Sequence, residues 1–205
     1  MTQAFASSII TMHQIKIIIE SENKPANLPT PEEIIQQCRI ERPAQVTETN
    51  KFGVKLPLGE GKYYWVKFGR SITMGEAKTQ DYVARVFDAR PDDTVRAPWV
   101  YLAFQWGQIC YIVMEYINGK TCENSDADLV ATAVQSLIDI KSPTSDSEPG
   151  PVGGGPIQHP FFIDWSASRR YESYKELEKH INGVSVPLGL SPYLYSSCTL
   201  DDSRW

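Results

Sequence analysis

Two hairpin-like segments constrain the fold of this chain more than any other feature of its sequence. The segments "QVTETNKFGVKL" (45–56) and "KYYWVKFG" (62–69) flank "PLGEG" (57–61), whose glycines and proline mark a turn. The segments "APWVYLAFQ" (97–105) and "ICYIVMEYI" (109–117) flank a second turn at "WGQ", and they are rich in β-branched and aromatic residues. Two such hairpins predict an antiparallel sheet.

Helical patterns precede and separate the hairpins. The segment "PEEIIQQCRI" (31–40) begins with proline at a favourable first position, has acidic residues in its first turn, and follows Thr30 as a candidate cap. Apolar residues recur at helical spacing over 71–89, and the helix must end before Arg90-Pro91. The chain therefore combines helices with the predicted sheet.

Two further helices are expected after the second hairpin. Residues 126–141 carry apolar side chains at helical spacing, with Ser125 at the cap and Lys141 in the last turn. The composition of 142–156 predicts a loop or linker. A last amphipathic helix is expected over 171–181. One of its faces carries four residues: Tyr171, Tyr174, Leu177 and Ile181. The complete order of elements predicts an α+β fold with an antiparallel sheet.

The charge and the cysteines of this 205-residue chain argue against several classes of site. A net charge of −5 disfavours a nucleic-acid partner or an anionic membrane surface. Cys38, Cys110, Cys122 and Cys198 lie far apart without a CxxC pair, so neither zinc nor a disulfide framework is predicted. The segment "SSIITMHQIKIII" (7–19) is too short and too interrupted for a membrane span or signal peptide, which makes the cytoplasm the expected location.

Lys67 stands inside the aromatic run of segment 62–69. Strand alternation places Lys67 on one face with Tyr63 and Trp65, and the residues between them on the other face. An ammonium buried among aromatic rings needs an anionic partner. The alternative is that the long side chain of Lys67 reaches solvent at a strand edge and has no further role.

Glu76 is the nearest candidate for that partner. Three other positions share its stripe of the helix: Gln80, Val83 and Phe87. Because this stripe faces inward, the carboxylate needs a cation, and Lys67 on the preceding strand is the nearest one in the sequence. A capping box from Thr73 to Glu76 is the competing interpretation, in which the carboxylate only caps its own helix.

The second hairpin ends in an open stretch of backbone. The strand "YIVMEY" (111–116) runs directly into "INGKT" (117–121), where Asn118-Gly119 ends it. Amides and carbonyls beyond a strand end are available to meet the edge of a ligand. The same pattern also fits an ordinary strand exit.

The order of these segments resembles the small lobe of the protein-kinase-like aminoglycoside phosphotransferase family. The resemblance rests on "YYWVKFG", then "MGEA" at the head of a helix, then "YIVMEYINGKT". The segments "PGPVGGGPIQHPFF" and "YESYKELEKHIN" are similar to the linker and helix of the fungal members, so the resemblance covers 45–183. The turn "LGEG" (58–61) stands where the family has its nucleotide loop or the adjoining turn, although it lacks a GxGxxG spacing.

The resemblance implies that five residues contact or position ATP. Lys67 would hold the α- and β-phosphates, and Glu76 would fix the position of the lysine. Glu115, Tyr116 and Ile117 would form the hinge whose backbone meets the adenine.

The chain departs from the family where the chemistry would occur. Family members carry a catalytic loop of the form H-G-D-x-x-x-x-N and, after it, a metal-binding Asp. None of His13, His159 and His180 is followed by Gly-Asp. Asp164 in "FFIDW" superficially resembles the metal-binding position, but no catalytic loop precedes it. We therefore assign no catalytic or metal-binding residue, and the Mg²⁺ that catalysis would need has no identified ligands.

The expected organisation has four parts. Residues 1–44 are an N-terminal extension with a short helix, and 45–122 are a kinase-like small lobe, an antiparallel sheet with one αC-like helix. Residues 123–183 are the linker and the first helices of an incomplete large lobe. Residues 184–205 are a divergent tail.

The resemblance implies the ATP-binding half of an enzyme that transfers the γ-phosphoryl group of ATP to a hydroxyl of a small acceptor or a protein. Because the catalytic loop is not found, we expect a truncated or shortened chain that is inactive as it stands. The alternatives are a non-catalytic module that binds a nucleotide or a protein partner, and an α+β domain in which Lys67 and Glu76 are only structural.

Overall fold

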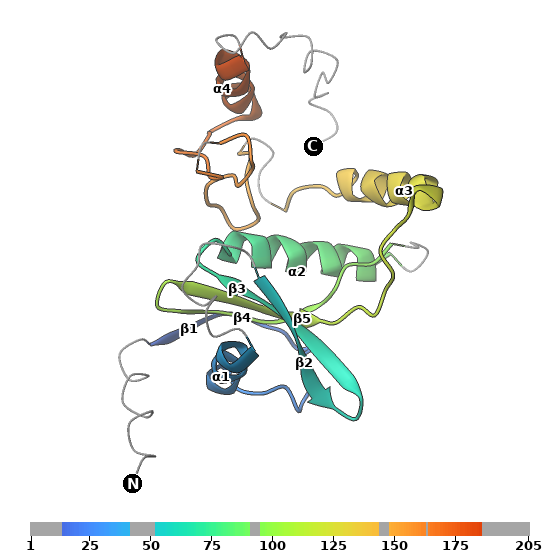
Figure 1. Ribbon diagram of the computed structural model, residues 1–205. Helices are drawn as coiled ribbons and strands as arrows, with labels where there is room; N and C mark the ends of the chain where they lie inside the picture. Colours follow the sequence, from blue (N-terminus) through green and yellow to red (C-terminus); the bar gives the residue numbers. More distant parts are fainter. Residues whose placement is uncertain (1–13, 42–51, 91–94, 144–147, 163, 186–205) are drawn as a thin grey trace. The chain divides into compact units, whose positions relative to one another are not determined.

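The computed structural model describes residues 14–41, 52–90, 95–143, 148–162 and 164–185 (Figure 1). The chain divides into two compact units, residues 1–127 and residues 128–205. The described residues form a five-stranded antiparallel sheet and four α-helices, which confirms the predicted α+β class. Within these ranges, no helix combines the length and the apolar character that a membrane span requires.

The sheet forms the centre of the first unit. Its strands are β1 (Ile15–Glu20), β2 (Phe52–Gly59), β3 (Lys62–Gly69), β4 (Val100–Trp106) and β5 (Ile109–Glu115). Their spatial order is β1-β4-β5-β3-β2, and all neighbouring strands are antiparallel. The two predicted hairpins are therefore confirmed as β2–β3 and β4–β5. Residues 45–51 of the first predicted strand lie outside the described residues.

The first strand, β1, was not predicted from the sequence. It pairs with β4 at the edge of the sheet, and its register shifts between Ile17 and Ile19. This irregularity breaks the alternation of side chains by which a strand is recognised, because Ile17 is exposed whereas Ile18 and Ile19 are both partly buried. Part of the segment taken as an N-terminal extension is thus the edge of the sheet itself.

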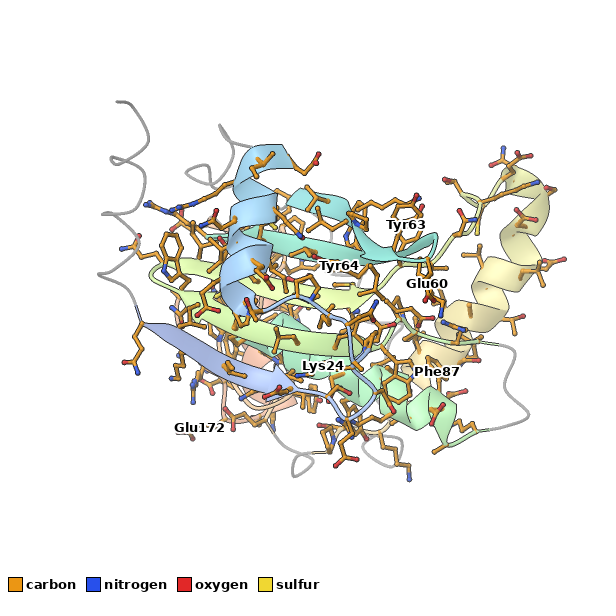
Figure 2. The ribbon with its side chains drawn as sticks, turned by 90° about the horizontal axis from the view of Figure 1, so that it is seen from below. Lys24, Glu60, Tyr63, Tyr64, Phe87 and Glu172 are labelled. Atoms are coloured by element: carbon orange, nitrogen blue, oxygen red, sulfur yellow. The ribbon has the colours of Figure 1, made fainter. Side chains whose placement is uncertain are left out.

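Helix α1 (Pro31–Glu41) begins as the sequence predicts and lies across one face of the sheet (Figure 2). The amide of Glu33 donates to Thr30 Oγ1 at 3.3 Å, and the amide of Thr30 donates to Glu33 Oε2 at 2.8 Å. This reciprocal capping box satisfies two amides that a helix start otherwise leaves without a partner.

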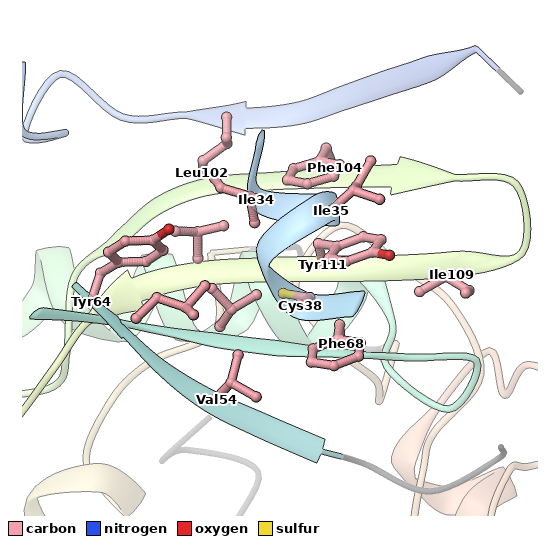
Figure 3. Packing of buried hydrophobic residues seen from close by; sticks show 13 residues of the cluster. Ile34, Ile35, Cys38, Val54, Tyr64, Phe68, Leu102, Phe104, Ile109 and Tyr111 are labelled. Carbon is pink, nitrogen blue, oxygen red and sulfur yellow. The ribbon is translucent and has the colours of Figure 1, made fainter. Parts of the chain in front are cut away.

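The buried face of α1 packs into the main hydrophobic core. Figure 3 shows Ile34, Ile35 and Cys38 facing the aromatic and aliphatic side chains of the strands. Tyr111 lies at the centre of this core, with its ring stacked between Phe68 at 5.7 Å and Phe104 at 4.8 Å, measured between ring centroids. The core residues are Ile34, Ile35, Cys38, Val54, Leu56, Tyr64, Val66, Phe68, Leu102, Phe104, Ile109, Tyr111 and Val113.

Helix α2 (Met74–Asp88) covers the opposite face of the sheet. Its small residue Ala77 packs with residues of β4 and β5 in a second buried cluster. The helix has its most extensive strand contacts with β4 and β1. It ends with Ala89 at the C-cap, directly before Arg90-Pro91 as predicted. On this face of the sheet, α2 therefore covers mainly β4 and β1, and it covers less of β2 and β3.

The second unit contains the remaining two helices. Helix α3 (Ala127–Ile138) is present, but its expected cap and its expected end are both wrong, because it ends three residues before Lys141. A 3-10 turn (Asn124–Asp126) precedes it, and Glu123 caps that turn reciprocally with Asp126, so Ser125 lies inside the turn. No residue of α3 is buried, and its apolar side chains are exposed: Leu129, Val130, Val134, Leu137 and Ile138.

Helix α4 (Tyr174–Ser185) begins three residues later than expected. Ser173 precedes it, and Ser173 Oγ accepts a hydrogen bond from the amide of Glu176 at 3.3 Å. Tyr171 therefore lies before the helix rather than on its face, and it is buried beside Phe162 with its hydroxyl against His180 Nδ1. Most of the predicted tail, residues 186–205, lies outside the described residues.

A pH-dependent loss of stability is expected from Cys38. Burial raises the pKa of its thiol from 9.0 to about 12. Because the folded pKa lies above the unfolded one, the stabilisation is complete below pH 9.0 and is lost as the pH rises toward 12. In that window Cys38 contributes a slope of about −1.4 kcal/mol per pH unit to the free energy of unfolding.

Urea unfolding at several alkaline pH values measures this slope. We expect Cys38→Ala to make this slope shallower by about 1.4 kcal/mol per pH unit, which corresponds to one proton. Cys122 is exposed and offers the control, because Cys122→Ala should leave the slope unchanged. An identical slope in wild type and Cys38→Ala would show that the thiol does not couple to folding.

Candidate functional site

Lys67 and Glu76 meet as the sequence predicts. Lys67 projects from β3 and Glu76 from the first turn of α2, and Lys67 Nζ lies 3.3 Å from Glu76 Oε1. The side chains are 38% and 24% exposed, so the Lys67 side chain is only partly buried and not enclosed among the rings as expected. A partly exposed ammonium can meet an incoming anion without first breaking its ion pair.

The interpretation in which the Glu76 carboxylate only caps its own helix is wrong, because the carboxylate contacts Lys67 and the cap bond comes from the amide of Glu76. Its backbone amide donates to Thr73 Oγ1 at 3.1 Å, so Thr73 is the N-cap of α2. Its carboxylate contacts Lys67. The cap fixes where the helix begins, and that start holds the carboxylate over β3.

Gln80, one turn further along α2, anchors the helix to the sheet. Its Nε2 lies 3.1 Å from the sulfur of Met114 on β5 and 3.4 Å from the carbonyl of Pro98. The predicted stripe of α2 thus faces the sheet, which explains why Glu76 and Lys67 lie within contact distance.

The strand register separates this ion pair from the exit of β5. Lys67 pairs with Ile112, and Glu115 at the end of β5 follows three residues later. Three residues of strand span about 10 Å. An elongated ligand lying along β3 and β5 could therefore touch the ammonium at one end and the open backbone at the other.

At the exit of β5, the backbone amide and the carboxylate of Glu115 already have partners within the protein. Its amide donates to the Trp99 carbonyl at 2.9 Å, and its carboxylate contacts Arg96 and accepts from the Trp99 amide at 3.4 Å. Burial first and the Glu115 carboxylate second raise the pKa of the Tyr101 hydroxyl. Of the three predicted hinge residues, Glu115 is therefore held by the loop before β4.

Tyr116 and Ile117 continue the chain beyond β5. Ile117 is 46% exposed, and Tyr116 is partly buried. The contact of Arg96 with Glu115 was not predicted, because nothing in the pattern around Arg96 marks a partner 19 residues away.

An aromatic patch lies on the same face as Lys67, and we define it as Lys55, Tyr63, Trp65 and Tyr116. Lys55 pairs with Trp65 across β2 and β3, and its ammonium lies 3.9 Å from the ring centroid of Tyr63 and 4.2 Å from that of Tyr116. The ring planes of Trp65 and Tyr116 are 29° apart with centroids at 6.3 Å. Figure 2 shows Tyr63 near Glu60, at the turn end of the hairpin. The predicted alternation of β3 is confirmed, whereas no role was predicted for Lys55.

The turn at 58–61 does not lie beside Lys67. The residue opposite Lys67 is Gly53, whereas the turn follows Gly59, which pairs with Lys62. Lys62 and Lys67 are five residues apart, about 17 Å along the strand. The "LGEG" turn therefore joins β2 to β3 at the end of the hairpin away from Lys67, so the register does not support the nucleotide loop, the first of its two predicted assignments.

Asp164, His159 and His180 lie in the second unit. Asp164 is exposed in a turn. His159 Nδ1 accepts from the amide of Phe161 at 3.1 Å, and His180 contacts Tyr171. Among the residues that the structure describes, no three His, Cys, Asp or Glu side chains gather as a metal site. His13 lies outside the described residues.

The candidate site thus consists of an ion pair, an aromatic patch and a strand exit on one face of the first unit. These features come from β2, β3, β5 and the start of α2. Comparison with protein-family models, with curated proteins and with solved structures finds no match to this chain.

Proposed function

We propose that the first unit binds a nucleoside triphosphate in the manner of a kinase-like small lobe. The observation that carries the proposal is the contact between Lys67 on β3 and Glu76 on α2. Two further features support it. The pair lies about 10 Å along the sheet from the exit of β5, and the Lys67 side chain is 38% exposed.

The phosphate end of the ligand would bind at Lys67. An ammonium is a compact charge that forms strong, charge-assisted hydrogen bonds with phosphate oxygens. Glu76 restricts the flexible lysine side chain, so less conformational entropy is lost when the phosphate binds. Glu76 itself would repel a phosphate, so its role in binding is to position the ammonium rather than to touch the ligand.

The base end would bind at the strand exit. The Glu115 amide already has a partner in Trp99, so a backbone contact to a base would come from Tyr116 or Ile117. This assignment narrows the three predicted hinge residues to two that contact the ligand and one, Glu115, that positions the exit.

In a complete phosphotransferase such a lobe would present the γ-phosphoryl group of ATP to a hydroxyl of a small acceptor or a protein. Mg²⁺ would supply charge neutralisation at the phosphates. The described residues offer no carboxylate cluster that fits this ion. We therefore derive no transfer step, and the proposed activity of this chain is nucleotide binding by a phosphotransferase-like protein.

Thermal unfolding with ATP, with and without Mg²⁺, tests the proposal. At a concentration of about 100 times Kd, ATP should stabilise the wild type by about 2.7 kcal/mol. Lys67→Met should abolish most of this gain, because the phosphate loses its cation. Without ligand, the same variant should lose less than about 1 kcal/mol, as expected for a partly exposed ion pair.

Lys16→Met is the matched control, since Lys16 is an exposed lysine of β1 in the same sheet. It should respond to ATP as the wild type does. Equal stabilisation of Lys67→Met and Lys16→Met, or no response in the wild type, would contradict the proposal. The second result would favour the alternative of a partner-binding module, for which the exposed apolar residues of α3 are the supporting observation.

A further inference from the structure

The exit of β5 is bonded to the segment that leads into β4. The guanidinium of Arg96 in this segment contacts the carboxylate of Glu115, the last residue of β5. The Trp99 amide donates to the same carboxylate at 3.4 Å, and the Glu115 amide donates to the Trp99 carbonyl at 2.9 Å. Residues 96–99 therefore hold both the side chain and the backbone of Glu115.

This contact lies on the face of the sheet opposite to the face that carries Lys67. Directly paired residues of antiparallel strands point to the same face. Glu115 pairs with Tyr64, whose side chain is buried in the core that packs with α1. Lys67 pairs with Ile112, whose side chain is buried in the cluster that packs with α2. A ligand that contacts Lys67 therefore does not touch the ion pair of Arg96 and Glu115.

Beyond Glu115 the chain leaves the sheet. Tyr116 and Ile117 have no strand partner among the described residues, and every residue of 117–123 is exposed. The end of a strand opens more easily than its centre, because fewer contacts hold it. The direction of the backbone at 116–117 therefore depends on how firmly Glu115 is held.

The ion pair also neutralises the Glu115 carboxylate. This side chain is only 25% exposed, and a carboxylate with so little access to water needs a cation near it. The segment that carries Arg96 is anchored on its other side by Gln80 of α2, whose Nε2 lies 3.4 Å from the Pro98 carbonyl. Without Arg96 the carboxylate would lose its cation, and its exposure to water would displace the end of the strand.

We infer that Arg96 is a positioning residue of the proposed site, and that it acts through Glu115 to fix the backbone at 116–117 for the base of the nucleotide. This inference rests on the proposed function, because that function places the base at 116–117. Arg96 does not touch the ligand. Its loss should therefore affect the base end of the site and not the phosphate end at Lys67.

Binding titrations of the full chain with ATP and with inorganic tripolyphosphate, which has the phosphate chain without a base, test the inference. The double variant Arg96→Met, Glu115→Gln removes the ion pair without changing the net charge. We expect it to weaken ATP binding by about fivefold, which is the upper range for a partly exposed ion pair. Tripolyphosphate binding should change by less than about twofold, because this ligand has no base to place at the strand exit. Arg96→Lys keeps the positive charge and should weaken ATP binding less than the double variant does.

The double variant Arg85→Met, Asp81→Asn is the matched control. These two residues also form an ion pair of an arginine with a carboxylate, with Arg85 Nε 2.9 Å from Asp81 Oδ2, but the pair lies within α2. The control variant should bind both ligands as the wild type does. A loss of ATP binding in the control equal to that at Arg96 and Glu115 would contradict the inference.

Lys67→Met separates this inference from the proposed function, because it should weaken the binding of both ligands. If the Arg96 and Glu115 double variant binds ATP as the wild type does while Lys67→Met does not, the positioning role is overturned and the proposed function stands. If the double variant loses both ligands equally, the ion pair only supports the fold, and the inference fails. If the wild type does not bind ATP, the proposed function fails and the inference with it.

Discussion

Replacing Ile34 by alanine is expected to destabilise the first unit by about 2–4 kcal/mol. Ile34 is 0% exposed and packs from α1 against the core side chains of the sheet (Figure 3). Alanine removes three carbon atoms from this contact and leaves a cavity that close-packed neighbours fill only in part. A loss of this size is a large fraction of the 5–15 kcal/mol that is typical of domain stability.

Ile40 provides a control on the same helix with the same substitution. It is 76% exposed, so Ile40→Ala should change the free energy of unfolding by less than about 0.5 kcal/mol. Urea unfolding of both variants, followed by tryptophan fluorescence, measures the difference. Equal effects of the two substitutions would mean that α1 does not pack on the sheet and that residues 31–41 are an extension after all.

Local patterns predicted most of the first unit. Both hairpins combine two β-rich runs with a short turn, and each turn fixes which residues pair. Helix α2 has a cap, an inward stripe and a defined end, and α1 has a proline and a cap at its start; these signals lie within each helix or next to it. Where the decisive contacts are local in sequence, the pattern is sufficient.

The predictions from sequence fail in two situations. In one, the signal that starts an element is ambiguous, and in the other, the element is defined by a partner that is distant in sequence. The cap of α3 is wrong because a 3-10 turn precedes the helix, so Ser125 lies inside that turn and Glu123 stands at its start. The pairing of β1 with β4 joins segments about 85 residues apart, and the irregular register of β1 removes its periodicity. Such an edge strand is identified by its partner rather than by its own residues.

The features of the candidate site can also be separated into those that were predictable from local sequence and those that were not. The contact between Lys67 and Glu76 was predictable because only nine residues separate them and the strand leads directly into the helix. The burial of the ammonium was overestimated, since the sequence does not say how much of that face α2 covers. The placement of Trp65 over Gly53 is a cross-strand contact, and it depends on the direction of one ring rather than on alternation.

Gly53 accordingly gives the second large expected effect. Its backbone is not in the left-handed region, so alanine can adopt the same conformation. The added Cβ would nevertheless lie 2.1 Å from Trp65 Cζ2 and would force the indole off its position. We expect Gly53→Ala to destabilise the first unit by about 1–3 kcal/mol, the usual cost of overpacking.

Gly119→Ala is the matched control. A Cβ at Gly119 would meet only Ile117 Cγ2, at an ordinary distance of 3.7 Å. We expect this change to alter the free energy of unfolding by less than about 0.5 kcal/mol. Urea unfolding of the two glycine variants measures whether the effect at Gly53 comes from the ring or from loss of glycine alone.

A double-mutant cycle with Trp65→Leu then assigns the clash to the indole. If the ring occupies the space above Gly53, Gly53→Ala should cost little in the Trp65→Leu background, because leucine leaves room for the added methyl group. The coupling energy should be about 1–2 kcal/mol and favourable to the double variant. Additive effects of the two substitutions would show that the indole does not occupy the space above Gly53 and that the cost of Gly53→Ala comes from elsewhere.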